Sequence, residues 1–166
     1  MDKDLFLQKV LDAEATLFHI SFSILHNEQD CADAVQEAIL KAYDARGSLR
    51  DEQFFKTWIV RIVINECYAL LRKANRFAPY AETFPPDTEA SEQMEKYINE
   101  EYQNLYRAVA KLDEKLRICV VLFYFEDYSV SEIAKIIHAP TGTVKSRLSR
   151  ARRLLKDLLD DQKEAI

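Results

Sequence analysis

The sequence predicts an all-α fold: two small helical domains joined by a flexible acidic linker. Only two glycines and four prolines occur in 166 residues, too few for the tight turns of a sandwich, a barrel or a multi-hairpin protein. Apolar residues recur at helical spacing along most of the chain. A proline-containing acidic stretch without that spacing interrupts the pattern. We therefore predict a first domain over 1–76, a linker over 77–100 and a second domain over 101–166.

The first domain is expected to hold three helices. The first covers about 5–25, and a polar break over 26–30 leads into a second helix over about 30–44. Gly47 and Ser48 mark a loop, and the third helix follows over about 52–75. The apolar residues expected to face inward on these helices are Leu5, Val10, Leu11, Leu17, Phe18, Ile20, Phe22, Leu25, Ala34, Val35, Ala38, Ile39, Ala42, Tyr43, Phe55, Trp58, Ile59, Ile62, Val63 and Leu70.

The linker is predicted from composition. Residues 78–93 hold three of the four prolines, no basic residue and no periodicity, as is typical of a flexible connection. Residues 77–100 carry one basic and six acidic side chains, a net charge of −5. A coiled 16-residue segment spans roughly 20–25 Å, and a straight one reaches roughly 50 Å. Two modules joined in this way can act at well-separated sites.

The second domain is predicted to be helical again, with helices over about 95–112 and from Asp113 onward, and a turn at 126–128. Ser129 and Glu132 have the spacing of a capping box. The short helix that they begin, over 130–137, ends before Pro140, because a residue that precedes proline avoids the helical region.

A last helix over about 141–160 completes a predicted helix-turn-helix, in which the small residue Ala134 allows the two helices to cross closely. One face of this last helix carries an apolar stripe at i, i+4, i+7, i+11 and i+14, made of Val144, Leu148, Ala151, Leu155 and Leu158. An ordinary helical hairpin with a charged face is the alternative interpretation.

Charge is distributed unevenly along the chain. The whole chain has a net charge of −5, yet residues 145–156 carry six basic side chains and no acidic one. Such a block on one helix indicates a polyanion-binding surface, although a solvated basic face is possible. Thr, Ser, Lys and Arg near the start of an exposed helix suit the major groove of DNA.

Two faces of the first domain carry further chemistry. Arg61, Asn65, Tyr68 and Arg72 share one face of the third helix, which suits single-stranded or melting DNA, because aromatic rings stack on bases and basic groups bind the backbone. Asp30, Asp33, Gln36 and Glu37 form an acidic stripe on the second helix. Either face could be merely solvated, and the acidic stripe could instead dock a basic protein partner.

The sequence also excludes several classes of function. It spells neither a dinucleotide-binding nor a P-loop motif, and its three cysteines and three histidines form no metal-binding pattern. We expect no catalytic residue, no metal, no cofactor and no small-molecule substrate. Cys31, Cys67 and Cys119 are expected to be buried, reduced thiols. No apolar run approaches the roughly 18 residues of a membrane span, and the first residues lack a signal-peptide pattern, so we expect a cytoplasmic protein.

The chain resembles a known family of proteins. Residues 30–76 resemble conserved region two of the extracytoplasmic-function (ECF) sigma factors, a group of the sigma-70 family, and residues 112–159 resemble their region four. The motifs that carry the resemblance are DCADAVQE (30–37), FKTWIVRI (55–62) and GTVKSRLSRAR (142–152). A short acidic linker in place of region three is also typical of this group.

The resemblance implies partners and residue roles. The partners would be core RNA polymerase, through its β′ clamp helices and β flap, promoter DNA, and an anti-sigma factor that is often membrane-bound. The residues implied to dock on the polymerase are Asp30, Asp33, Gln36 and Glu37. Those implied to read the −10 element are Leu49, Arg50, Trp58, Arg61, Asn65 and Arg72. Those implied to read the −35 element are Thr143, Lys145, Ser146, Arg147, Ser149, Arg150 and Arg153.

Three positions depart from the family pattern. Leu49 stands where many members have an aromatic residue, His138 where the turn usually has Gly or Asn, and Thr141 where an acidic residue is common. The resulting prediction is a promoter-specificity subunit of RNA polymerase without enzymatic activity. The alternatives are a stand-alone helix-turn-helix regulator, which usually binds two-fold sites as a dimer, and a helical adaptor that binds no DNA.

Overall fold

The computed structural model describes residues 1–77 and 100–164, and every regular element in these ranges is helical. Contacts divide the chain into two units, 1–81 and 82–166. The all-α prediction is confirmed. The predicted linker over 78–93 and the predicted helix start at Glu95 lie outside the described residues.

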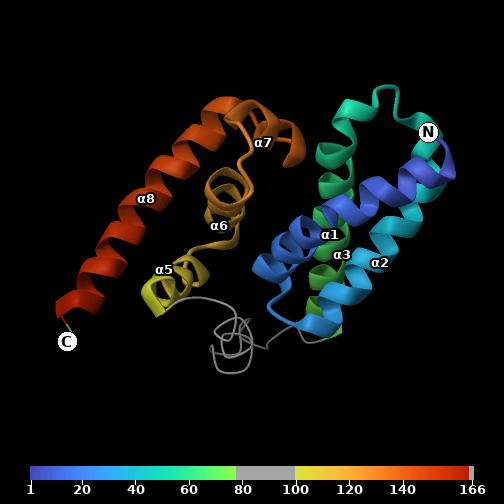
Figure 1. Cartoon of the computed structure of the whole chain (residues 1–166). Coiled ribbons are helices and arrows are strands. Elements are labelled where there is room, and N and C mark those ends of the chain that lie inside the picture. The colour runs from blue at the N-terminus through green and yellow to red at the C-terminus, as the bar shows by residue number, and fades with distance from the viewer. Residues whose placement is uncertain (78–99, 165–166) are drawn as a thin grey trace. The chain divides into compact units, whose positions relative to one another are not determined.

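The first unit consists of three packed helices, α1 (Lys3–Leu25), α2 (Glu28–Ala45) and α3 (Phe55–Phe77), each in contact with the other two (Figure 1). Two short 3₁₀ turns, η1 (Arg46–Ser48) and η2 (Glu52–Phe54), connect α2 to α3. Phe6, Leu17, Ile20, Ile59 and Val63 are at most 1% exposed. These residues form the core that holds the outer faces of α2 and α3 in place.

Side-chain caps set the helix ends of this unit. Asp2 accepts a hydrogen bond from the Leu5 amide at 2.9 Å, and Asn27 accepts one from the Asp30 amide at 2.9 Å. The second helix therefore begins two residues before the predicted start, because Asn27 supplies the N-cap. Residues 52–54 belong to η2, so α3 begins at Phe55 and not at Glu52.

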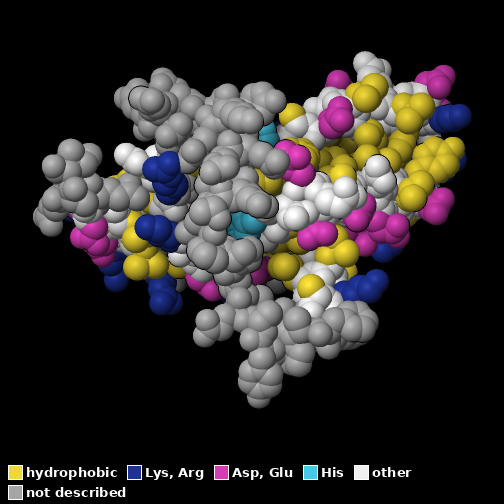
Figure 2. All heavy atoms as spheres, turned by 90° about the horizontal axis from the view of Figure 1, so that it is seen from below, with side chains coloured by type: hydrophobic (Ala, Val, Ile, Leu, Met, Phe, Trp, Pro, Cys, Tyr) yellow, Lys and Arg dark blue, Asp and Glu magenta, His cyan; other side chains and the backbone are white. Residues whose placement is uncertain are grey.

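The predicted core of this unit needs one correction. Leu11 is 68% exposed, so its prediction as an inward residue is wrong. The buried positions of α1 recur from Phe6 through Val10, Ala13, Leu17 and Ile20, and Leu11 falls outside that stripe. Trp58, Ile62 and Leu70 are half-buried. In Figure 2, apolar and acidic side chains lie beside one another, with a few basic ones, on the visible face of this unit.

The second unit contains α5 (Glu100–Ala110), α6 (Glu114–Val120), the π-helical turn η3 (Val121–Phe125), α7 (Val130–Ile136) and α8 (Thr141–Glu164). α5, α6 and α7 all pack along α8 (Figure 1). With 24 residues, α8 is roughly 36 Å long. It serves as the support of the whole unit.

A buried arginine joins α5 to α6. Arg117 is 3% exposed, and its Nη1 donates hydrogen bonds to the carbonyls of Ala110 and Leu112, both at 3.0 Å. These carbonyls lie at the end of α5, where backbone acceptors lack helical partners. The guanidinium therefore caps α5 from inside the unit and fixes the connection between the two helices.

Candidate nucleic-acid and polymerase interfaces

The helix-turn-helix is formed by α7, the turn over 137–140 and α8. Its capping box is confirmed: the Glu132 amide donates to Ser129 Oγ at 3.2 Å, and the Ser129 amide donates to Glu132 Oε2 at 2.8 Å. His138 adopts φ 54°, and the Ala139 amide donates to the Ala134 carbonyl at 3.0 Å. This bond across a left-handed residue is the Schellman ending of a helix, and it turns the chain directly into α8.

α8 presents most of the predicted −35 residues to solvent. Val144, Leu148, Ala151 and Leu155 are buried, as the apolar stripe predicts, and Leu158 is half-buried. The opposite face carries the exposed side chains of Lys145, Ser146, Ser149, Arg150 and Arg153. Thr143 is half-buried in the first turn. The structure therefore brings five basic or hydroxyl side chains together on one free helical face.

Two arginines lie at the edges of this face. Arg147 is half-buried and interacts with the Cys119 thiol, whose pKa is raised by burial and lowered in part by the Arg147 charge and hydrogen bond, with a net upward shift. Arg152 donates to the Tyr124 hydroxyl at 3.0 Å. Arg147 is thus held toward α6, and its assignment to DNA stays a prediction.

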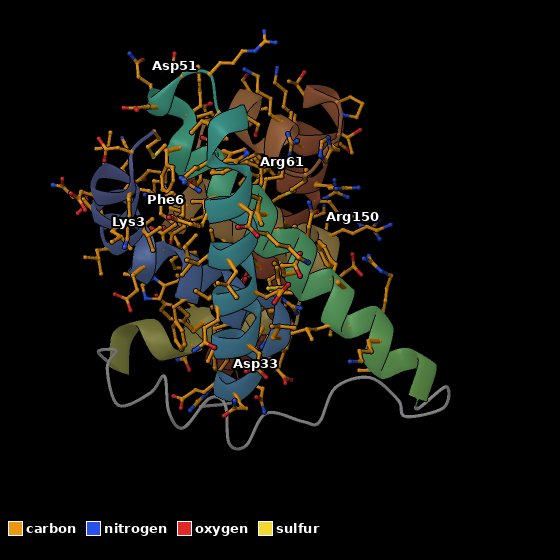
Figure 3. The ribbon with its side chains drawn as sticks, turned by 90° about the vertical axis from the view of Figure 1, so that its right-hand side faces the viewer. Lys3, Phe6, Asp33, Asp51, Arg61 and Arg150 are labelled. Atoms are coloured by element: carbon orange, nitrogen blue, oxygen red, sulfur yellow. The ribbon has the colours of Figure 1, made fainter. Side chains whose placement is uncertain are left out.

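The acidic stripe on α2 is fully exposed. Cys31, Ala34, Ala38 and Ala42 are buried on the opposite side of α2, so the side chains of Asp30, Asp33, Gln36 and Glu37 all point into solvent. Figure 3 shows Asp33 near one end of the unit and Asp51 near the other.

Lys41 and Leu40 complete this stripe. Lys41 Nζ lies 3.5 Å from Glu37 and 2.8 Å from Glu66 of α3, so it ties the stripe to the neighbouring helix. Leu40 is 63% exposed on the same side, one turn beyond Gln36 and Glu37. The sequence analysis did not single out Leu40, although it follows Glu37 by three positions and Gln36 by four and so shares their helical face.

The loop between α2 and α3 is held in place by local contacts. Arg46 lies 3.9 Å from the Tyr43 ring centre and donates to the Tyr43 carbonyl. Asp51 accepts from the Gln53 amide at 2.9 Å, and Lys9 Nζ donates to the Glu52 carbonyl at 3.4 Å. Between these anchors, Leu49 is half-buried and Arg50 is exposed.

α3 turns the remaining predicted −10 residues outward. Arg61, Asn65 and Arg72 are exposed, whereas Tyr68 is half-buried. Trp58 is half-buried too, with its ring 5.9 Å from that of Phe55. Phe54, which sequence reasoning missed, is 57% exposed. The sequence analysis predicted only Phe55 of the adjacent Phe54-Phe55 pair as an inward residue, and Phe55 is the buried one.

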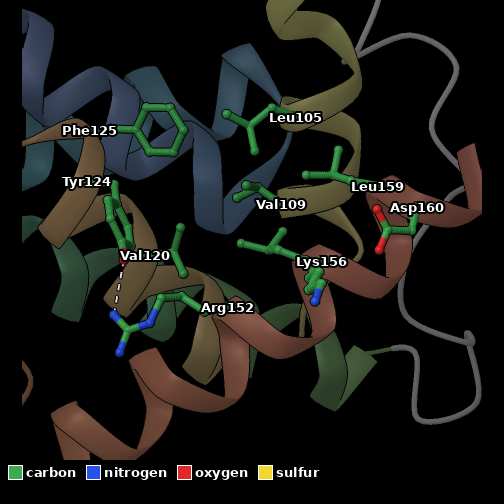
Figure 4. Close-up of a pocket in the computed structure, with 10 residues that line it drawn as sticks. Leu105, Val109, Val120, Tyr124, Phe125, Arg152, Lys156, Leu159 and Asp160 are labelled. Carbon is green, nitrogen blue, oxygen red and sulfur yellow. Dashed lines mark hydrogen bonds between the residues drawn. The ribbon is translucent and has the colours of Figure 1, made fainter. Parts of the chain in front are cut away.

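The second unit also holds an apolar groove that sequence reasoning did not predict. Its volume is about 520 Å³, and Figure 4 shows side chains from α5, η3 and α8 around it. The apolar lining residues are Leu105, Val109, Val120, Tyr124, Phe125, Leu155 and Leu159, and the charged ones are Arg152, Lys156 and Asp160. The π-helical turn at 121–125 places Tyr124 and Phe125 on this groove. The spacing of apolar residues in the sequence does not predict such a turn.

The cysteines and histidines form no site within the described residues. Cys31, Cys67 and Cys119 are free and buried, as predicted. Burial and the nearby Cys67 raise the pKa of Cys31 to about 12, and burial raises that of Cys67 to about 11. Residues 1–77 and 100–164 contain no group of side chains placed to hold a metal ion, and none of their helices is long and apolar enough to cross a bilayer.

Comparison with known proteins agrees with this geometry. Residues 12–77 match Sigma-70 region 2, and residues 102–155 match Sigma-70, region 4. The chain is 30% identical over 156 residues to the RNA polymerase sigma factor SigV of Bacillus subtilis, a match covering 93% of this chain and 90% of that protein. It is 35% identical over 137 residues to the ECF RNA polymerase sigma-E factor of Escherichia coli, covering 76% of this chain and 72% of that protein.

A solved structure resembles the whole chain. It is the sigma factor RpoE of Bartonella quintana in complex with the anti-sigma factor NepR. The TM-score is 0.79 with 25% sequence identity, and the match covers 95% of this chain and 98% of that one. With both sigma regions matched in order and curated relatives aligned along most of its length, the chain belongs to the ECF group of the sigma-70 family and is a sigma factor for transcription initiation.

Proposed function

We propose that this sigma factor directs core RNA polymerase to promoters by reading a −35 element with α8. The exposed face formed by Lys145, Ser146, Ser149, Arg150 and Arg153 is the observation that carries this proposal. Arg and Lys can donate to guanine O6 and N7, and serine hydroxyls can bond several base edges. The buried stripe on the opposite side and the Schellman turn at His138 present this face as one rigid surface.

The −10 element is assigned to the first unit. Leu49 and Arg50 lie in the anchored loop, and Arg61, Asn65 and Arg72 extend along α3, with Trp58 beside them. Guanidinium and amide groups next to aromatic rings suit DNA strands that have separated. Bases bound there would offset an unstacking cost of a few kcal/mol per base.

Two further surfaces suit the polymerase itself. The stripe of Asp30, Asp33, Gln36 and Glu37, with exposed Leu40 beside it, offers charge and an apolar anchor to the β′ clamp helices. The groove between α5, η3 and α8 offers an apolar seat, with a basic edge, to the β flap. Attachment at both surfaces would hold both DNA-reading units on one enzyme, and linked sites gain affinity through effective concentration.

Regulation by an anti-sigma factor belongs to this proposal. The similar RpoE structure contains the anti-sigma factor NepR. A partner of that kind would compete with the polymerase for the docking surfaces, and a membrane-anchored one would keep this chain at the membrane. The work of the chain itself is binding, without catalysis.

Run-off transcription tests the proposal. Purified core RNA polymerase is incubated with a promoter template, with and without this chain, and specific transcripts are measured. We expect a defined transcript only when both proteins are present. A chain that binds DNA with the same specificity without core polymerase, and that adds no transcript, would instead be a stand-alone regulator.

A further inference from the structure

Phe54 is the most exposed large aromatic side chain among the described residues, with 57% of its surface accessible. It closes η2, immediately before the first residue of α3. Its neighbour Phe55 is 3% exposed and lies edge-on to Phe6, with ring centres 5.7 Å apart. The chain therefore sends one ring of this pair into the core and the other into solvent.

The backbone beneath Phe54 is firmly held. The Phe54 amide donates to the Asp51 carbonyl at 3.2 Å, and the Asp51 carboxylate accepts from the Gln53 amide at 2.9 Å. Lys9 Nζ lies 6.0 Å from the Phe55 ring centre and donates to the Glu52 carbonyl at 3.4 Å. The exposure of the Phe54 ring is thus built into a fixed turn that α1 supports.

Phe54 also has the register of the outer face of α3. Arg61 follows it by seven positions and Arg72 by eighteen, which correspond to about two turns and about five turns of helix. Asn65 lies on the same line, and all three polar residues are exposed. A free ring at the start of a row of guanidinium and amide groups has the composition of a single-strand binding surface.

The charges around the ring favour contact with a base over contact with a phosphate. Asp51 and Glu52 precede it by three and two residues and are exposed, and their carboxylates would repel a phosphate group. The aromatic face is sequence-tolerant, because every base presents a π-face. Arg50 and Arg61 are exposed on either side of the turn in the sequence and can hold the backbone that flanks a stacked base.

We propose that Phe54 stacks on an unpaired base of the −10 element. This inference rests on the proposed function of the first unit, and it adds a residue that positions melted DNA. The ring serves as a platform for one base, while the groups along α3 bind the neighbouring nucleotides.

The test uses holoenzyme assembled from core RNA polymerase and the full chain. The probe is promoter DNA that wild-type holoenzyme selects from a randomised pool, prepared with an unpaired −10 segment. We expect Phe54→Ala to weaken binding of this probe roughly five- to 150-fold, the range for losing one base–aromatic stack. Phe54→Trp should retain the affinity, and Leu11→Ala, a change at an even more exposed apolar residue on α1, should leave it unchanged.

The outcomes separate this inference from the proposed function. Wild-type affinity in Phe54→Ala, with Arg61→Ala and Asn65→Ala both impaired, would overturn the stacking role and leave the −10 assignment intact. Wild-type affinity in all three variants would overturn the −10 assignment itself. If Phe54→Ala weakened core polymerase binding as much as it weakened DNA binding, the stacking role would also be contradicted. The same holds if Phe54→Trp lost affinity for the DNA probe.

Discussion

Individual residues set the turn that leads into α8. His138 adopts φ 54°, a conformation that costs a non-glycine residue roughly 1–2 kcal/mol. Glycine removes that cost, but its greater freedom in the unfolded state lowers the free energy of unfolding by roughly 0.5–1 kcal/mol. The exposed His138 side chain is therefore a poorer choice for stability than glycine at this position.

We expect His138→Gly to raise the free energy of unfolding of the second unit by about 0.5–1 kcal/mol. His138→Val should lower it, because a β-branched residue tolerates positive φ least. Urea unfolding of the full chain, followed by amide hydrogen exchange in α7 and α8, measures both changes. A glycine variant less stable than wild type would show that the His138 side chain makes a stabilising contact.

The buried thiols give the first unit a defined pH dependence. Cys31 has a pKa of about 12 in the folded chain, and Cys67 one of about 11, whereas an unfolded thiol titrates near 8.5. Because the folded pKa values are raised, each protonated thiol contributes to the free energy of unfolding, and this contribution is fully present below pH ~8.5. It is lost as the pH rises toward the folded pKa values, by about 1.4 kcal/mol per pH unit for each thiol.

We expect the unfolding free energy of Cys31→Ala to fall less steeply with pH than that of wild type between pH 9 and 10.5. Tryptophan fluorescence reports on this unit alone, because Trp58 is the only tryptophan. Parallel slopes for the two proteins would contradict burial of an ionisable Cys31 thiol.

Among the helices, α2 carries the acidic stripe that we propose as a docking surface for core polymerase. Asp33 and Glu37 are exposed, and only Glu37 has a cation within ion-pair distance, Lys41 at 3.5 Å. We expect charge reversal by Asp33→Lys with Glu37→Lys to weaken core polymerase binding at least tenfold, about 1.4 kcal/mol, because like charges would then face the partner. The unfolding free energy should change by less than about 0.5 kcal/mol, as is usual for exposed sites.

A matched control for α2 comes from α1. Asp12→Lys with Glu14→Lys makes the same change in net charge at two exposed positions, and it should leave core binding unchanged. Equal affinity for core polymerase in both double variants, measured by fluorescence anisotropy, would remove the acidic stripe from the interface.

The faces of α8 predict different roles for Arg150 and Arg152. Arg150 is exposed, whereas Arg152 is held by the Tyr124 hydroxyl at 3.0 Å. We expect Arg150→Ala to cost about 1–3 kcal/mol on the preferred −35 element and to relax its preference at one or two base pairs. We expect Arg152→Ala to leave the preference unchanged, since its contact with Tyr124 holds it off the face that carries Arg150.

This comparison uses holoenzyme on −35 variants at fixed salt. A uniform loss of affinity in both variants would mean that the helix faces are misassigned. Unchanged binding in both variants would mean that α8 does not read the −35 element.

Much of this architecture was predictable at the element scale because it depends on local chemistry. The spacing of Ser129 and Glu132 predicted the start of α7, and Pro140 predicted its end. The apolar stripe from Val144 to Leu155 predicted the buried side of α8. The π-helical turn at 121–125 was not predictable, because no local sequence pattern marks such a turn. The groove that it lines was missed for the same reason.

The site residues also divide into those placed by helical period and those placed by contacts between elements. The exposed positions of Arg61, Asn65 and Arg150 follow from helical period, which the sequence displays. The inward turn of Arg147 depends on Cys119, which is distant in the sequence, and the contact of Arg152 depends on Tyr124. Such pairings follow from how α6, η3 and α8 meet, which periodicity does not describe.

The molecule consists of two helical units joined through residues 78–99, and we propose that each unit contacts both promoter DNA and core polymerase. Residues 77–100 have a net charge of −5, whereas residues 145–156 carry six basic side chains and no acidic one. Under the proposed function, this sigma factor reads two short elements at once and gains its specificity from their combination.

Selection from a randomised DNA pool tests this account most directly. The pool is incubated with core polymerase alone, with the chain alone, and with both together, and the bound DNA is sequenced. We predict that only the combination selects two separated, non-palindromic blocks. Arg61→Ala and Asn65→Ala should alter the block nearer the start site, and Arg150→Ala the one farther upstream. Selection of one two-fold symmetric block by the chain alone, or a change in the same block by both groups of variants, would contradict the account.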